Sequence, residues 1–288
     1  MRETKTARWG QERRLEFIDF RLHWDRRLNR AELVDFFGIS IQQASLDISR
    51  YAELAPSNLE YDKSEKVYRA AESFKPAVAL PRAQSYLEQV LAVVTGTMPQ
   101  STTFLGWMPP TDIVKFPVRS IDTDALIAIN QAIRFGQDLE LEYQSMRQPD
   151  SKRRWIAPRA IAYDGSRWHV RAWCYSREGF RDFVFSRIQR IYQTRASQLM
   201  NQVDSRWESY ATVVLTPKRS LSASQMRAVE MDFGMTDGEL RVSMRQALVF
   251  YFLRLLHLVG GQEVQDSQPI EWANRKELAW LVDEARKT

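Results

Sequence analysis

The chain has 288 residues, enough for two or three domains of about 100–150 residues each. Hydrophobic residues make up 44% and charged residues 27%, as in an ordinary globular protein, and the one cysteine, Cys174, excludes an internal disulfide. No apolar run approaches the roughly 20 residues of a membrane span, and no apolar signal-peptide segment precedes the first charges. We therefore expect a cytoplasmic protein with no membrane partner.

The net charge of +5 is unevenly distributed. Residues 1–50 hold 10 Lys and Arg against 8 Asp and Glu, which gives +2. Residues 141–200 hold 12 against 5, which gives +7, and the remainder sums to −4. A basic excess suggests a polyanionic partner such as nucleic acid. Because most of it lies in the middle of the chain, we consider two anion-facing surfaces.

Three helices are predicted at the N-terminus. Residues 11–28 repeat apolar side chains at helical spacing, with charges between them. A second helix follows the N-cap Asn29 and ends at Gly38, which suits a left-handed stop. Ser40 caps a third helix that runs to about Leu54. Two helices around a short glycine turn indicate a helix-turn-helix.

A β-hairpin follows directly. In residues 59–70, "LEYDKSEKVYRA", aromatic and apolar residues stand on both sides of a polar turn. Three helices followed by a hairpin make a winged helix-turn-helix, which we assign to residues 1–75. The two prolines within residues 73–81 mark a domain boundary.

The third helix of a helix-turn-helix lies in the major groove of DNA. If Ala44 and Ile48 face the core, its outward side chains include two glutamines, which read adenine, and Ile and Leu, which pack on thymine methyl groups. Cations of the wing tip and first helix would contact phosphates, and the cap of the third helix would offer a hydroxyl and an N–H. The predicted DNA-binding residues are Ser40, Ile41, Gln42, Gln43, Ser45, Arg50, Lys63, Lys66, Arg13 and Arg14. The alternative is a helical module that binds protein and not DNA.

The middle of the chain changes from helices to strands. Residues 76–118 form a predicted helical linker, with a helix at 82–96 and then a proline-bearing loop. A short helix capped by Asp122 precedes four predicted strands, at 139–145, 154–165, 167–176 and 180–191. Short antiparallel strands in about 55 residues imply a small curled sheet or barrel, and we assign a domain to residues 119–198.

The last two of these strands, in residues 166–188, carry five arginines and a histidine. Side chains alternate along a strand, so Trp168, Val170, Ala172 and Cys174 are predicted to face the core. Pairing across a turn near residues 176–179 would gather His169, Arg171, Arg181 and Arg187 on the other face, and the preceding strand adds Tyr143, Ser145 and Arg147.

This arginine surface suits a planar anion. Guanidinium groups bind phosphate bidentately, and aromatic rings stack on bases. The alternative is a solvated strand face whose arginines pair with Asp182 and Glu142. We assign Cys174 no chemistry and expect it to be a small buried hydrophobe.

The C-terminal region, residues 205–288, alternates strands and helices and is predicted to be a small α+β domain. Residues 247–259, "ALVFYFLRLLHLV", are apolar nearly all round, so this helix is buried within the domain or against a second subunit. Together with the linker it offers the natural dimer surfaces. The fold class is thus α+β multidomain: a winged helix-turn-helix, a small antiparallel β-barrel-like domain and a C-terminal α+β domain.

Catalytic motifs are missing from the sequence. It contains no phosphate-binding glycine loop, no zinc-deaminase or zinc-protease motif, and no clustered carboxylates beside the basic strands. We therefore predict that the chain is not an enzyme and holds no metal or cofactor. A nucleic-acid-processing enzyme and a protein-binding adaptor remain the alternatives.

Residues 139–191 resemble a WYL domain, named for a Trp-Tyr-Leu run. The segment "IAPRAI" (156–161), the tryptophan of "RWHV" and the segment "FVFSRI" (183–188) stand in the expected order. With the flanking domains, the resemblance to bacterial WYL transcription factors spans nearly the whole chain. The eponymous run is Trp168-His169-Val170 here, so a histidine replaces a pocket-facing tyrosine.

The resemblance implies a function. Chains of this kind are similar to regulators found beside phage-defence operons of the BREX and CBASS types, which are homodimeric repressors that bind inverted repeats. It implies a homodimer on a pseudo-palindromic double-stranded DNA operator, and a pocket that senses an anionic nucleotide or nucleic-acid fragment. By position, that pocket would involve Tyr143, Ser145, His169, Arg171, Arg181 and Arg187. Ligand binding would then shift operator occupancy.

Overall fold

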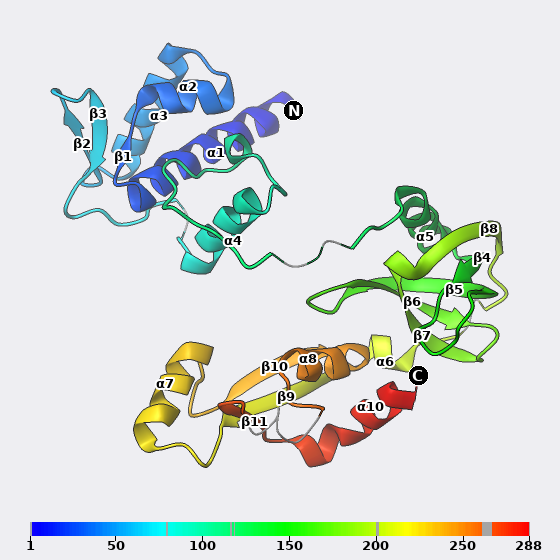
Figure 1. The fold of residues 1–288 in the computed structure, drawn as a ribbon. Coiled ribbons are helices and arrows are strands. Elements are labelled where there is room, and N and C mark those ends of the chain that lie inside the picture. The colour runs from blue at the N-terminus through cyan, green and yellow to red at the C-terminus, as the bar shows by residue number, and fades with distance from the viewer. Residues whose placement is uncertain are drawn as a thin grey trace. The chain divides into compact units, whose positions relative to one another are not determined.

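A computed structural model describes residues 2–78, 80–115, 117, 119–199, 202–260 and 267–287. The chain divides into two compact units, Met1–Phe116 and Pro117–Thr288 (Figure 1). Within the described residues, the first unit has one hydrophobic core and the second has two.

The first unit is a winged helix-turn-helix, as predicted. Its helices are α1 (Arg2–Trp24), α2 (Arg30–Phe37) and α3 (Ile41–Leu54), and its wing consists of β2 (Leu59–Asp62) and β3 (Val67–Ala70). A short strand that the sequence did not predict, β1 (Arg27–Leu28), pairs with β3 and gives the strand order β1-β3-β2.

Local signals set the helix boundaries in this unit. The Asn29 side chain and Glu32 form a reciprocal capping box at the start of α2, and Gly38 ends the helix with a left-handed φ of 63°. The Ser40 hydroxyl accepts the N–H of Gln43 at the start of α3. Helix α1 begins and ends earlier than the helix predicted at 11–28, and it stops at Trp24 because Arg26 turns left-handed with a φ of 58° just before β1.

A buried polar network joins α1, α3 and the chain that leaves the wing. The Tyr51 hydroxyl donates to Asp19 Oδ1 at 2.5 Å and accepts from Asn58 Nδ2 at 3.0 Å. Asp19 also accepts the backbone N–H groups of Ala77 and Val78 at 3.1–3.2 Å. The end of the wing segment is therefore hydrogen-bonded into the helical core.

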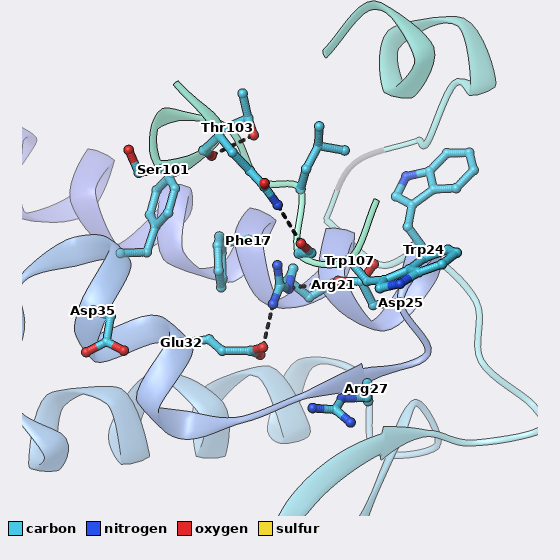
Figure 2. Close-up of a pocket in the computed structure, with 14 residues that line it drawn as sticks. Phe17, Arg21, Trp24, Asp25, Arg27, Glu32, Asp35, Ser101, Thr103 and Trp107 are labelled. Carbon is cyan, nitrogen blue, oxygen red and sulfur yellow. Dashed lines mark hydrogen bonds and ion pairs between the residues drawn. The ribbon is translucent and has the colours of Figure 1, made fainter. Parts of the chain in front are cut away.

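The linker segment also packs on the winged helix-turn-helix. After α4 (Ala83–Val94) and η1 (Gln100–Thr102), the chain crosses the C-terminal half of α1, where Arg21 is buried between Asp25 at 3.0 Å and Glu32 at 2.6 Å (Figure 2). A Cβ atom at Gly106 would overlap the Arg21 guanidinium, so the backbone approaches that group as only glycine can. A cavity of about 970 Å³ lies alongside these residues.

The second unit begins with α5 (Thr123–Phe135), which packs on a five-stranded antiparallel sheet (Figure 1). The strands are β4 (Gln137–Tyr143), β5 (Lys152–Tyr163), β6 (Trp168–Cys174), β7 (Gly179–Val184) and β8 (Ile188–Ala196), in the order β7-β6-β5-β4-β8. Ala125, Ile129 and Ala132 of α5 bury against Leu139, Leu141 and their neighbours.

The predicted strand at 180–191 is wrong as a single element. A 3₁₀ turn, η2 (Phe185–Arg187), divides it into β7 and β8, which are the two edges of the sheet. Three residues reach only about 10 Å, so these edges come close at this end. The sheet therefore curls toward the predicted barrel but stays open.

The chain then forms α6 (Ser205–Glu208), β9 (Tyr210–Pro217), α7 (Ala223–Phe233), β10 (Leu240–Arg245), η3 (Gln246–Leu248), α8 (Val249–Leu255), β11 (Ile270–Trp272) and α10 (Arg275–Lys287). The three strands make a sheet in the order β10-β9-β11. Helix α8 buries Val249 and Leu253 but leaves Leu255 54% exposed, and it is shorter than predicted because His257 turns left-handed with a φ of 57°. No helix in the described ranges is long and apolar enough to span a bilayer.

Replacing Tyr51 with phenylalanine tests the buried network. The variant removes a hydroxyl that is hydrogen-bonded to a buried carboxylate, and we expect the free energy of unfolding to fall by about 1–2 kcal/mol. Urea unfolding of the full chain measures the loss. Tyr61→Phe, at an exposed position of the wing, is the control and should change stability by less than about 0.5 kcal/mol. Equal stabilities for the two variants would show that the network contributes nothing.

Candidate functional site

Helix α3 presents a mixed surface to solvent. Ala44 and Ile48 are buried as predicted, whereas Ile41 and Leu46 are 60% and 64% exposed. Gln42 and Arg50 are also exposed, as are Lys63 and Lys66 of the wing. These two large apolar side chains are exposed to solvent, and such side chains are suited to contact with the methyl groups of thymine.

Other predicted DNA-binding residues have partners inside the unit. The Ser45 hydroxyl donates to the carbonyl of Ile41 at 2.9 Å and accepts from Arg30 at 3.1 Å. Arg13 pairs with Glu16 at 2.9 Å, and its guanidinium lies 4.0 Å from the ring centre of Phe104.

Arg14 and Gln43 both bind Asp47. Arg14 Nε lies 2.6 Å from Asp47 Oδ2, and Gln43 Nε2 lies 3.2 Å from the same oxygen. Arg14 could reach a phosphate only by leaving Asp47 buried without its counter-charge, which costs several kcal/mol. The predicted DNA-binding residues therefore fall into two groups. Some are exposed to solvent, and others, such as Arg14, are paired inside the unit and hold this surface in place.

A cavity of about 250 Å³ in the second unit brings together five of the six predicted ligand-binding residues. It lies beside the edge strand β7, between the sheet and α8, and no residue of the first unit contributes to it. The predicted residues that line it are Tyr143, Ser145, Arg171, Arg181 and Arg187. Arg147, which the sequence also suggested, lines it as well.

The predicted register of β6 and β7 is wrong by one residue. Arg171 stands opposite Asp182, and Arg181 stands opposite Ala172. A one-residue shift moves every side chain to the other face, so Arg181 does not share a face with His169 and Arg171. The cavity still collects Arg171 and Arg181, because it reaches both faces of an edge strand.

The prediction of which β6 side chains face the core and which face solvent is also wrong at the first two positions of the strand. Trp168 is 47% exposed and lies against Tyr163, with ring centres 4.8 Å apart, beside the turn that joins β5 and β6. Val170, Ala172 and Cys174 are fully buried as predicted. His169, expected on an exposed basic face, is only 4% exposed and does not line the cavity.

His169 belongs to a buried cluster behind the cavity. Its Nε2 lies 2.9 Å from Asp164 Oδ2, and its ring lies 5.0 Å from that of Tyr251. Burial alone would raise the pKa of the Asp164 carboxyl. Hydrogen bonds from His169 and from the backbone N–H groups of Ser166 and Arg167 outweigh it and hold that pKa below its usual value.

Arg171 is buried and paired twice. Its Nε and Nη2 donate to Asp204 at 2.6 and 3.1 Å, and its Nη1 donates to Asp182 at 3.2 Å. Asp182 in turn accepts the Tyr251 hydroxyl at 2.9 Å. Burial and the nearby Asp182 raise the pKa of Tyr251, so its hydroxyl stays protonated and remains a donor beside the cavity.

The cavity is strongly cationic. Six arginines line it: Arg147, Arg154, Arg171, Arg181, Arg187 and Arg206. Asp182 is the one carboxylate among the described lining residues, and Asp204 pairs with Arg171 behind it. Burial, and then the neighbouring Arg171, lower the pKa of Arg206. A multiply charged anion would relieve this repulsion.

Several lining residues were missed by the sequence prediction. Strand alternation places Arg154 opposite Leu141, on the inner face, and could have indicated it. Arg206, Phe250 and Tyr251 come from α6 and α8, and no local pattern connects those helices to the sheet. Among the described residues, no three His, Cys, Asp or Glu side chains are grouped as metal ligands.

Comparisons with known proteins match all three regions. Residues 10–92 match the winged helix-turn-helix domain of the BrxR transcriptional regulator, residues 124–193 match the WYL domain, and residues 210–278 match the BrxR C-terminal dimerization domain. Among solved structures, the proteasome accessory factor B/C of Arthrobacter aurescens aligns with 96% of this chain and 48% of its own, at 18% identity and a TM-score of 0.26.

Close relatives share nearly the full length. A protein of Pseudomonas aeruginosa named DNA-binding transcriptional repressor CapW is 44% identical over 278 residues, which cover 96% of this chain and 93% of that protein. Proteins of the same name from Escherichia coli and Stenotrophomonas maltophilia are 41% and 38% identical, with coverage of 96% and 97% of this chain and of 93% and 95% of theirs.

Replacing Arg171 with methionine tests its structural role. The variant leaves Asp204 and Asp182 without their shared counter-charge, and we expect a loss of about 3–5 kcal/mol in the free energy of unfolding. Urea unfolding at neutral pH measures it. Arg177→Met, in the exposed turn between β6 and β7, is the matched control. A loss below about 1 kcal/mol at Arg171 would contradict the assignment.

Proposed function

The chain belongs to the family of CapW DNA-binding transcriptional repressors, and from that premise we propose that it is a homodimeric repressor regulated by an anionic ligand. The observation that carries the ligand part is the cavity, whose described lining residues include six arginines and one carboxylate. The winged helix-turn-helix carries the DNA part.

The proposed DNA surface is the exposed side of α3 with the wing. Ile41, Gln42, Gln43 and Leu46 would contact base edges in the major groove, with a preference for A·T base pairs. Arg50, Lys63 and Lys66 would contact phosphates. Ser40 would add its backbone N–H at the start of the helix. Arg13, Arg14 and Ser45 would support this surface from within, given their internal partners.

The proposed ligand is a small, multiply charged anion with a flat ring, such as a nucleotide or the end of a nucleic-acid fragment. A cavity of about 250 Å³ holds little more than one such unit. Arg154, close to the rings of Tyr143 and Phe183, combines a cation with aromatic faces. Because the walls come from both the sheet and α8, the affinity for the ligand would change if these elements moved apart. Ligand binding would therefore favour one arrangement of the sheet and α8, and this shift would change the affinity for DNA.

The proposed dimer is supported by the match of residues 210–278 to a dimerization domain. In the linker, α4 exposes Leu87 and Leu91 one turn apart, which gives this helix an apolar face open to solvent. A two-fold dimer would require a pseudo-palindromic operator with half-sites separated by multiples of roughly 34–36 Å. We further propose a cytoplasmic location and a phage-defence operon as the target.

The two alternatives are less well supported. A protein-binding adaptor would have no salt-dependent affinity for DNA. A nucleic-acid-processing enzyme would need catalytic groups beside the basic cavity, whereas the relatives are named for a regulatory role.

A gel shift with the DNA upstream of the chain's own gene tests the repressor proposal. We expect retardation by a dimer, with an affinity that falls at least tenfold between about 50 and 200 mM salt because phosphate contacts release counterions. Absence of retardation at low salt would refute the proposal. Retardation equal to that of random duplex DNA would refute sequence specificity.

Charge reversal at two arginines that line the cavity tests the ligand proposal. In the double variant Arg147→Glu/Arg187→Glu, we expect unchanged operator affinity in the absence of ligand and at least tenfold weaker binding of the most effective nucleotide. Isothermal calorimetry with a panel of mono-, di- and cyclic nucleotides and two- to four-nucleotide DNA measures it. Arg177→Glu, outside the cavity, is the control. A nucleotide response that survives the double variant would refute the assignment of this cavity.

A further inference from the structure

Asp47 is an unusual residue for its position on α3. It faces the core beside Ala44, Ile48 and Tyr51, and its side chain is completely buried. A buried carboxylate is strongly unfavourable unless it is paired and hydrogen-bonded. Its partners therefore indicate what it does.

The first partner of Asp47 is Arg14 of α1. Arg14 Nε lies 2.6 Å from Oδ2, and Nη2 lies 3.4 Å from Oδ1. The Arg14 side chain is itself only 15% exposed, so this is a largely buried pair that fixes α3 against α1.

The second partner is Gln43, one turn earlier on the same helix. Its Nε2 donates to Asp47 Oδ2 at 3.2 Å, and its backbone N–H donates to the Ser40 hydroxyl at 3.1 Å. A carboxylate paired with an arginine only accepts hydrogen bonds, so the Nε2 end of the carboxamide must face it. The carbonyl oxygen Oε1 and the second N–H of Gln43 remain available.

These two groups are the ones that read adenine. A glutamine accepts from adenine N6 through Oε1 and donates to N7 through an N–H on the same side of the amide. We propose that Asp47 is a positioning residue for base recognition, which holds the Gln43 carboxamide ready for an adenine. This inference rests on the proposed DNA-binding function of α3.

The expected benefit is one of preorganisation. A glutamine that is free in solution loses rotamer freedom when it binds a base, and ordering one such side chain in advance improves affinity by roughly twofold to tenfold. Gln42 is the internal control, because it is the same residue type on the same turn. Its side chain is exposed and makes no hydrogen bond within the described residues.

The test is a cycle of variants in the full-length chain. Arg14→Met/Asp47→Leu replaces the buried pair by apolar residues, so that no charge is left unpaired. The DNA is an operator selected in vitro from a pool of random duplexes, with a scrambled duplex of equal length as reference. The measured quantity is the dissociation constant for the scrambled duplex divided by that for the operator, at one salt concentration, so that a lower ratio means a loss of sequence specificity.

We expect the Arg14→Met/Asp47→Leu pair to lower this ratio twofold to tenfold in the wild-type background and in the Gln42→Ala background. In the Gln43→Ala background, the same pair should have no further effect, because the side chain it positions is gone. An equal drop in the Gln43→Ala background would overturn the proposal, since Asp47 would then act only through packing. If the unmodified chain selects no operator, the proposed function fails instead.

A measurement on the unmodified chain does not depend on whether the variants fold. In the DNA-free protein, ¹⁵N relaxation of the side-chain amides should give Gln43 an order parameter near rigid values of about 0.8 and Gln42 one below about 0.6. Single Gln→Ala variants assign the two signals. Equal order parameters would overturn the proposal.

Discussion

The buried guanidinium of Arg171 determines how the second unit is assembled. A cation can be buried there because carboxylates from two distant segments reach it, Asp182 from β7 and Asp204 from the start of α6. Asp204 also caps α6, and Asp182 accepts the hydroxyl of Tyr251 in α8. One side chain thus sets the spacing between the sheet and the helices that enclose the cavity. Arg171, one of the predicted ligand contacts, is therefore mainly a structural part of the wall.

The first unit uses buried ion pairs in the same way. Arg14 and Asp47 fix α1 against α3, and Arg21 joins α1 to Glu32 of α2. Such pairs add little net stability, but breaking one leaves a buried charge, so they favour a single packing arrangement over its alternatives. For a helix that must present side chains to base edges, a unique packing is worth more than additional stability. The arginines of this chain therefore divide into those that hold the fold and those that face solvent or the cavity.

Features encoded by neighbouring residues were predictable, and features encoded by distant ones were not. Caps such as Asn29, Ser40 and Gly38 act on the next few residues, so the boundaries of α2 and α3 follow from the sequence. The faces that β6 and β7 share depend on the length of the turn between them, here residues 175–178, and the prediction missed this. One of the two partners of Arg171, Asp204, stands 33 positions away, in a region without strand periodicity. The sequence thus indicated six of the cavity residues, but not the burial of Arg171 and His169 or the contribution of α6 and α8.

The close approach of Gly106 to Arg21 has an evolutionary consequence. Any side chain at position 106 would displace a guanidinium that the carboxylates of Asp25 and Glu32 hold, and Asp25 also accepts the backbone N–H of Trp107. A larger residue at position 106 therefore requires a shorter residue at position 21. The two positions, 85 residues apart, should be inherited as a pair.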